Sequence, residues 1–330
     1  MVFIPRPNAT LHAARKAKND EFYTRLCDVE RELDHYADQF RGKAIYLPCD
    51  DYRSSAFWVY FSGRFESLGL TRLTATHYAP GGGVAHRADL TADGLTVTPL
   101  SGDGDFRSPE AIAHLKQADI VVTNPPFSLF REHVTKLIEH DKKFVLIGNP
   151  NAITYKEIWS LIQSGNLWLG NPVPRGSLWY GLEPGSEEGL KKRDATCFRY
   201  ENGVPQARRH SAWFTNIEIP RRHEEIPLYR RYADDPDAYP AYANFDAIEV
   251  SKVKDIPGDY YGPMGVPITF LGRHNPDQFE IVGAGGELAG PIEGKPRPGR
   301  FYIPENGSLR RLYERIIIRR IQRDEAGDAV

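Results

Sequence analysis

An asparagine, two prolines and a phenylalanine stand in a row at Asn124, Pro125, Pro126 and Phe127. The amide oxygen of the asparagine and the carbonyl of the first proline can accept hydrogen bonds, and the phenylalanine ring can pack against another flat ring. The prolines stiffen the loop, because each fixes its own φ angle and lacks a backbone donor. Together these groups can hold a planar ring that carries an amino group, such as a nucleic-acid base.

Two interpretations of this tetrapeptide stay open. Asn-Pro and Pro-Pro pairs are ordinary where a strand ends, so the four residues could simply be a loop. Their position favours a functional site, because residues 118–123 form an apolar, β-branched run typical of strands buried in parallel sheets. In open α/β sheets, ligands bind beyond the carboxyl ends of such strands.

The tetrapeptide also suits methyl transfer to an exocyclic amine. The lone pair of that nitrogen is delocalised into the ring, and acceptors at Asn124 and Pro125 would localise it toward the methyl group. No strong base is needed, because alignment and electrostatic stabilisation supply the catalysis. Phe127 would hold a base that has been flipped out of a duplex.

Two further loops carry carboxylates that could bind a cofactor. Asp50 and Asp51, next to Cys49, could accept hydrogen bonds from an ammonium group or from ribose hydroxyls. A simple turn is the alternative, since the usual glycine-rich loop is absent. Asp105 could accept from the amine of an adenine while Phe106 packs on the base. Gly-Asp-Gly-Asp could equally be a plain turn, and the other ligands of a calcium loop are missing.

Strand-like and helix-like segments alternate through the first half of the chain. We expect strands at residues 44–47, 72–78, 95–100, 118–123 and 144–148, and helices at 20–40, 54–68, 109–116 and 129–139. Ser108 is placed to cap the third helix. This alternation predicts an α/β fold with a Rossmann-like, doubly wound and mainly parallel sheet. Beyond residue 151 proline and glycine become frequent, and we expect an appended α+β region closed by a helix at 309–322.

Composition narrows the class of protein. The chain has 330 residues, of which 41% are hydrophobic and 26% charged, as in a soluble globular protein. It shows no stretch long enough to span a membrane and no secretory signal, so we expect a cytoplasmic protein. Cys27, Cys49 and Cys197 are too scattered for a disulfide framework or a cysteine zinc site, and we expect no metal.

Charge gives only a local signal for nucleic-acid binding. The formal net charge is −2, so any such surface must be a patch. Basic residues cluster with aromatic and acidic neighbours between residues 175 and 231. A solvated surface of mixed charge is the simpler interpretation of this cluster.

Several runs of the sequence resemble a known family. Asn-Pro-Pro-Phe resembles the motif of S-adenosylmethionine-dependent adenine methyltransferases. Longer runs resemble the EcoRI-type adenine-specific DNA methylases, namely residues 18–24, 102–108, 119–131, 148–156 and 260–269. They extend the resemblance over nearly the whole chain.

The resemblance implies transfer of a methyl group from S-adenosylmethionine to N6 of a flipped adenine in a short duplex DNA sequence. The system would be of the restriction-modification type, with a cognate endonuclease as functional partner. It also implies a division into residues 1–155, the S-adenosylmethionine-binding catalytic domain, and 156–330, the rest of the catalytic sheet plus a DNA target-recognition region.

The resemblance further implies roles for individual residues. The catalytic residues would be Asn124, Pro125, Pro126 and Phe127. The cofactor contacts would be Asn19, Phe22, Tyr23, Thr24, Cys49, Asp50, Asp51, Asp105 and Phe106. The DNA contacts would be Arg175, Lys191, Lys192, Arg193, Arg208, Arg209, Arg221 and Arg222.

Two other functions stay open at this point. The chain could methylate the amine of an RNA base or of a protein glutamine, or it could be a non-catalytic DNA-binding protein. The sequence does not determine the DNA recognition sequence, the existence of a cognate nuclease or the oligomeric state, although a monomer is compatible with it.

Overall fold

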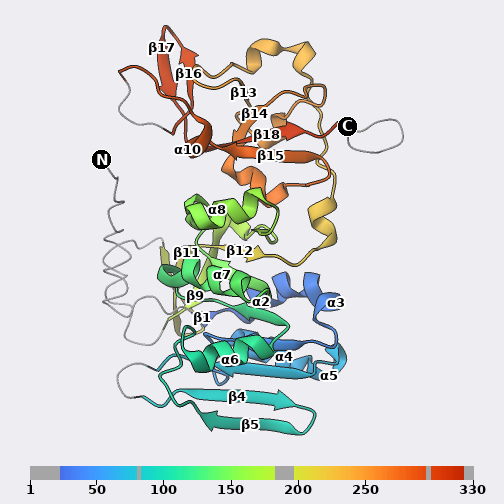
Figure 1. The fold of residues 1–330 in the computed structure, drawn as a ribbon, viewed down its shortest axis with the longest axis vertical. Coiled ribbons are helices and arrows are strands. Elements are labelled where there is room, and N and C mark those ends of the chain that lie inside the picture. Colours follow the sequence, from blue (N-terminus) through green and yellow to red (C-terminus); the bar gives the residue numbers. More distant parts are fainter. Residues whose placement is uncertain (1–22, 80–82, 183–196, 295–298, 323–330) are drawn as a thin grey trace. The chain divides into compact units, whose positions relative to one another are not determined.

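The computed structural model describes residues 23–79, 83–182, 197–294 and 299–322 (Figure 1). The chain forms two compact units. The first consists of Met1–Ile162 and Asn166–Ile217, and the second of Gln163–Gly165 and Glu218–Val330. The division implied by the resemblance, into a cofactor-binding part at residues 1–155 and a DNA-reading part at 156–330, describes roles, and it stays a prediction.

A large mixed sheet organises the first unit. Its eight strands follow the order β5-β4-β3-β2-β6-β7-β12-β8. They are β2 (Ala44–Leu47), β3 (Arg72–Thr76), β4 (His86–Thr91), β5 (Gly94–Pro99), β6 (Ile120–Thr123), β7 (Lys143–Gly148), β8 (Trp168–Leu169) and β12 (Ala212–Thr215). The adjacent strands β3, β2, β6 and β7 are parallel, whereas the ladders that flank them are antiparallel. The prediction of a mainly parallel sheet is therefore right only for these four strands.

The central strands are buried because their side chains are apolar on both faces. Leu47, Val121, Val122 and Ile147 are almost completely inaccessible to solvent. Strands buried on both faces read as continuous apolar runs, which is why they could be located from the sequence. By contrast, β5 is an edge strand with exposed side chains, and it pairs with β4 as a hairpin (Figure 1).

The helices of the first unit begin and end close to the predicted segments, with one clear exception. They are α2 (Leu26–Leu33), α3 (Ala37–Phe40), α4 (Ala56–Gly63), α5 (Phe65–Leu68), α6 (Pro109–Gln117), α7 (Phe130–Glu139) and α8 (Lys156–Gln163). Ser108 caps α6 as predicted, since its hydroxyl accepts from the backbone N–H of Ala111 at 3.1 Å. A single helix over residues 20–40 is wrong, because Tyr23–Thr24 form strand β1 and a 3₁₀ turn, Asp34–Tyr36, interrupts the rest. Pairing with a strand far away in the sequence decides the conformation of Tyr23 and Thr24.

A smaller antiparallel sheet completes the first unit. Its order is β1-β9-β11-β10, with β9 at Ser177–Gly181, β10 at Phe198–Glu201 and β11 at Val204–His210. Ser211 separates β11 from β12, and β12 begins with Ala212 opposite Gly148, the last residue of β7. One end of the small sheet is thereby attached to the carboxyl end of β7.

The second unit is built on a four-stranded sheet and a hairpin. The sheet order is β13-β14-β18-β15, with bounds Ile248–Glu249, Met264–Pro267, Arg315–Arg320 and Phe279–Ala284. The hairpin consists of β16 (Tyr302–Glu305) and β17 (Ser308–Arg311), and α10 spans Gly285–Leu288. Short 3₁₀ turns occur in both units. Besides Asp34–Tyr36, those of the first unit lie at Phe127–Leu129, Pro150–Thr154 and Pro174–Gly176, and those of the second at Pro220–His223, Tyr232–Asp234, Pro236–Ala238, Val253–Asp255 and Ile268–Arg273.

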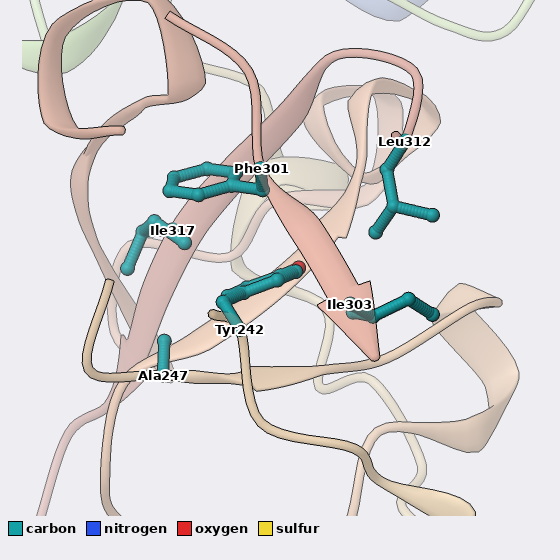
Figure 2. Packing of buried hydrophobic residues seen from close by; sticks show 6 residues of the cluster. All are labelled: Tyr242, Ala247, Phe301, Ile303, Leu312 and Ile317. Carbon is teal, nitrogen blue, oxygen red and sulfur yellow. The ribbon is translucent and has the colours of Figure 1, made fainter. Parts of the chain in front are cut away.

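The predicted helix over residues 309–322 is wrong, because this stretch forms β17 and β18. Ile316, Ile317 and Ile318 are all buried, and they pair with both β14 and β15. Three consecutive β-branched residues suit a central strand that is covered on both faces. Ile317 joins a core cluster with Tyr242 and Phe301, whose rings stack at 4.6 Å (Figure 2).

A buried ion pair connects strands of the second unit. Arg315 on β18 binds the carboxylate of Glu249 on β13, with its closest contact at 2.8 Å, and Tyr242 donates its hydroxyl to the same carboxylate. Glu249 is only 1% exposed. A buried carboxylate needs such partners, because an unpaired charge is strongly unfavourable inside a protein.

No helix within the described ranges is long and apolar enough to cross a membrane.

Candidate active site

The candidate site lies at the carboxyl ends of two neighbouring parallel strands. Ile45 and Tyr46 of β2 pair with Ile120 and Val121 of β6, so the loops that follow both strands meet at one edge of the sheet. The chain continues from β2 to β3 on one side, whereas β6 lies on the other side. Such a switch in strand order opens the crevice in which open α/β sheets bind their ligands.

A short hydrogen bond joins these two loops. The hydroxyl of Thr123, the last residue of β6, donates to Asp50 at 2.6 Å, and Ser55 donates to the other carboxylate oxygen at 2.7 Å. Asp50 is buried, and this burial raises its pKa to about 6, although the two hydroxyl donors oppose the shift. Asp50 thus holds the end of β6 in place, directly before Asn124.

Asp51 and Cys49 lie in different surroundings from Asp50. The carboxylate of Asp51 is 29% exposed, and it accepts a hydrogen bond from the backbone N–H of Arg53 at 3.0 Å. Burial raises the pKa of the Cys49 thiol, which keeps this group neutral. Of these three residues, Asp51 is the one that presents an accessible negative charge.

The side chain of Asn124 is held by the small sheet. Its Nδ2 donates to the hydroxyl of Thr24 at 3.3 Å, and Thr24 pairs with Tyr180 in the β1–β9 ladder. Pro125 is buried, whereas Asn124 and Phe127 are half-buried. The structure therefore brings Thr24 to the tetrapeptide, Tyr23 is the exposed residue before it in β1, and Asn19 and Phe22 lie outside the described residues.

The loop with Asp105 returns to the carboxyl end of β3. The backbone N–H of Ala79 donates to the carbonyl of Asp103 at 2.8 Å. Gly104 has a φ of +80°, and a Cβ at this position would collide with the carbonyl oxygen of His77. Glycine at residue 104 thus permits the close approach that places Asp105 and Phe106 at the same edge of the sheet as Asp50.

Two residues next to this loop were not predicted. Arg107 forms an ion pair with Asp105 and reaches Glu132 on α7 at 3.4 Å. His133 packs edge-on against Phe106, with a ring separation of 4.6 Å. Burial lowers the pKa of His133 to about 3, so its imidazole is neutral. The only sequence signal for His133 was its place on the apolar face of a predicted helix.

The candidate DNA-binding arginines are distributed over both units. Arg175, Arg208 and Arg209 belong to the first unit, and Arg221 and Arg222 to the second. Arg209 is half-buried, and burial lowers its pKa, whereas Arg175 is exposed. Lys191, Lys192 and Arg193 lie outside the described residues.

The described residues form no group of three or more His, Cys, Asp or Glu side chains that could hold a metal ion.

The first unit thus has a large mixed α/β sheet with the asparagine–proline loop at the carboxyl ends of its parallel strands, which is consistent with a methyltransferase fold. The sequence model of the family described as "Adenine-specific methyltransferase EcoRI" matches residues 10–92 and 82–321. The chain belongs to this family. The predicted resemblance and the predicted enzyme class, an adenine-specific DNA methyltransferase, are thereby confirmed.

Curated relatives are similar over most of their length. "Type II methyltransferase M.EcoRI" of Escherichia coli is 44% identical over 292 residues, which cover 83% of this chain and 89% of the relative. "Type II methyltransferase M.MpnI" of Mycoplasma pneumoniae is 36% identical over 323 residues, which cover 94% of this chain and 97% of the relative. "Type II methyltransferase M.MgeORF184P" of Mycoplasma genitalium is 35% identical over 323 residues, with coverage of 94% and 98%. No solved structure matches the chain.

Proposed function

We propose that the chain transfers a methyl group from S-adenosylmethionine to N6 of adenine in a short duplex DNA sequence. It would be the modification enzyme of a restriction-modification system, as the Type II names of its relatives suggest. The observation that carries the proposal is the position of Asn124, at the carboxyl end of β6 with its amide held by Thr24. The hydroxyl of the neighbouring Thr123 donates to the carboxylate of Asp50, so two adjacent side chains at the end of β6 are held by hydrogen bonds.

S-adenosylmethionine supplies an electrophilic methyl group on a positively charged sulfur when it is bound. The side chains at the sheet edge fit such a molecule. Asp51 offers a partly exposed carboxylate for an ammonium group or ribose hydroxyls. Asp105 would accept from an adenine amine by giving up part of its ion pair with Arg107, beside the buried ring of Phe106. Asp50 would contribute mainly by holding the loop, because both of its oxygens already accept short hydrogen bonds.

The amine of the target adenine would be oriented by the tetrapeptide. The hydrogen bond from Nδ2 to Thr24 restrains the amide of Asn124, and its Oδ1 atom would accept one amine hydrogen. The carbonyl of Pro125 would accept the other hydrogen. Both bonds draw the nitrogen lone pair out of the ring system and aim it at the methyl group, and fixed acceptors need no reorganisation during the reaction.

The target base must leave the duplex before it can reach this edge. Extrusion of a base costs a few kcal/mol of stacking and pairing, and enzymes recover part of this by stacking the base on aromatic side chains. Phe127 follows the two prolines and is only half-buried, so it can take this role. The prolines limit the freedom of the loop that carries it.

The finer architecture belongs to the same proposal. The first unit would be a Rossmann-like, doubly wound catalytic domain, and the appended second unit would contribute to target recognition. Residues 1–155 would bind the cofactor, and residues 156–330 would complete the sheet and read the DNA.

Labelled S-adenosylmethionine and unmethylated genomic DNA test the proposal. We expect label in DNA, with N6-methyladenine at one short sequence motif in single-molecule sequencing. Asn124→Ala should lower turnover by about 10²–10³-fold, the range seen when one electrostatic catalytic contact is removed, while cofactor binding stays intact. RNA and total protein serve as parallel substrates. Label in RNA or protein alone would replace DNA as the substrate, and a chain that binds no cofactor would be a non-catalytic protein.

A further inference from the structure

One face of the small antiparallel sheet carries basic and aromatic side chains. Residues paired in register across an antiparallel sheet point to the same side. Trp179 pairs with Arg208, and Ser177 pairs with His210. Arg199 pairs with Gln206, two residues before Arg208 on β11, so it lies on the same face. We call this side, with Trp179, Arg199, Arg208 and His210, the arginine–tryptophan face.

The tryptophan ring organises the two arginines of this face. The guanidinium carbon of Arg199 lies 4.3 Å from the centroid of the Trp179 ring, and that of Arg208 lies 5.9 Å from it. A cation within about 6 Å of an indole face is attracted by the ring. Arg199 is also bound to Glu201 at 3.0 Å, so its charge is already partly neutralised. The ring thus restrains Arg208 without removing its positive charge.

Charge pairing separates the candidate arginines into two groups. Within the described part of the chain, neither Arg175 nor Arg208 has a carboxylate at ion-pair distance. By contrast, the candidate Arg222 is paired with Glu218. Two further arginines of the basic cluster are also paired, Arg230 with Asp255 and Arg231 with Asp259. An arginine that already has a carboxylate partner gains less from a phosphate, because the first partner must be given up.

Arg175 lies at the end of this face that adjoins the catalytic edge. It precedes Gly176, whose carbonyl accepts from the backbone N–H of Ser211 at 3.2 Å. Ala212, which follows Ser211, pairs with Gly148 at the carboxyl end of β7. Because β7 is the neighbour of β6, the turn with Arg175 lies along the same sheet edge as the tetrapeptide.

The conformation of Arg175 also presents it to solvent. Its backbone has a φ of 54° and a ψ of 23°, in the left-handed region that an arginine rarely adopts, and Gly176 follows with a φ of 64°. Two successive left-handed residues turn the chain sharply before β9 begins. The side chain at the turn is exposed.

We infer that Arg175 and Arg208 bind backbone phosphates of the DNA substrate, with the Trp179 ring restraining the guanidinium group of Arg208. The inference rests on the proposed function and assigns the phosphate contacts within it. Arg209 lies on the opposite side of β11, where Ala207 and Tyr180 are buried, and takes no part in this contact, since successive strand residues alternate between faces.

Salt dependence of DNA binding tests this assignment. The logarithm of the binding constant falls with the logarithm of the salt concentration, with a slope of about −0.9 for each phosphate contact to duplex DNA. Fluorescence anisotropy would measure the binding of full-length Arg175→Gln and Arg208→Gln across a salt series. The DNA would be an unmethylated duplex that contains the sequence motif identified by single-molecule sequencing. We expect each variant to reduce the size of the slope by about 0.9, and the double variant by about 1.8.

Arg72→Gln is the matched control. Arg72 is exposed, begins β3 and binds Gln117 at 2.9 Å, so it carries the same charge at the amino edge of the sheet. Its slope should equal that of the unaltered chain. If the unaltered chain methylates DNA and all variants have its slope, the inference is overturned while the proposed function stands. The same holds if Arg72→Gln lowers the size of the slope as much as Arg175→Gln and Arg208→Gln do. An unaltered chain that neither binds nor methylates DNA would overturn the proposed function as well.

Discussion

Asp50 at the end of β2 and Thr123 at the end of β6 are joined by a hydrogen bond of 2.6 Å, although 73 residues separate them in the chain. This bond connects the loop proposed to bind the cofactor with the loop proposed to hold the target base. A second bond, from Asn124 to Thr24, adds the small sheet to the same assembly. The candidate site is therefore a set of mutually fixed loops, and a change at one loop should be felt at the others.

Thr24→Val should lower turnover while leaving the affinity for S-adenosylmethionine unchanged. Valine keeps the shape and the strand preference of threonine but cannot hold the amide of Asn124. The loss of one orienting hydrogen bond is worth about 1 kcal/mol, so we expect turnover to fall roughly 5- to 10-fold. Steady-state kinetics and isothermal titration calorimetry with the cofactor separate the two effects.

Thr24→Ser and Thr96→Val are the controls for this prediction. Serine retains the hydroxyl and should restore most of the turnover, and Thr96 is exposed on the edge strand β5. Weakened cofactor binding with normal turnover would instead make Thr24 a cofactor contact, as the family resemblance implies.

The stability of Asp50→Asn relative to the unaltered chain should increase with pH. Burial raises the pKa of Asp50 from 3.8 to about 6, so between these values the folded chain binds a proton more tightly than the unfolded chain. The stabilising contribution of Asp50 is present in full below pH 3.8 and is lost as the pH rises through 6. Asparagine does not titrate, so the difference in unfolding free energy should change by about 3 kcal/mol across this window.

Urea denaturation at several pH values measures this difference. Thr123→Val provides an internal check, because it removes a hydroxyl donor that lowers the pKa of Asp50. The upper end of the window should then move to higher pH, while the lower end stays at 3.8. A stability difference that is independent of pH would show that Asp50 does not titrate differently in the folded state.

Phe127→Ala should weaken the stacking of the flipped base. Stacking on an aromatic side chain is worth about 1–3 kcal/mol for each base, so affinity for the target duplex should fall by roughly 5- to 150-fold. A 2-aminopurine in place of the target adenine should show a different fluorescence in the complexes of the variant and the unaltered chain. The same analogue outside the recognition sequence is the control, and identical fluorescence in both complexes would exclude stacking by this ring.

Arg315→Leu should destabilise the second unit by about 3–5 kcal/mol, because it leaves Glu249 buried without its counter-charge. Arg319→Leu on the same strand is the matched control. Arg319 and its partner Glu280 are each about half exposed, and such surface pairs contribute only about 0–1 kcal/mol. Urea denaturation of both variants makes the comparison. Equal losses would mean that the buried pair contributes no more than an exposed one.

The sequence by itself determined the family, the enzyme class and the central strands. Apolar runs such as Ile120–Thr123 are continuous because both faces of the strand are covered, so local composition is enough to find them. The tetrapeptide at Asn124 could be singled out because its chemistry resides in adjacent residues.

Only the tertiary structure decided the features that depend on distant partners. Tyr23–Thr24 became a strand through pairing with β9, and Ile316, Ile317 and Ile318 became a central strand between β14 and β15. Local propensity cannot anticipate either result, because the stabilising partners are remote in the chain. The same reason applies to the links from Asp50 to Thr123 and from Thr24 to Asn124. It applies as well to the ion pairs that distinguish Arg222 from Arg208, since a charged side chain reveals its partner only when the chain has folded.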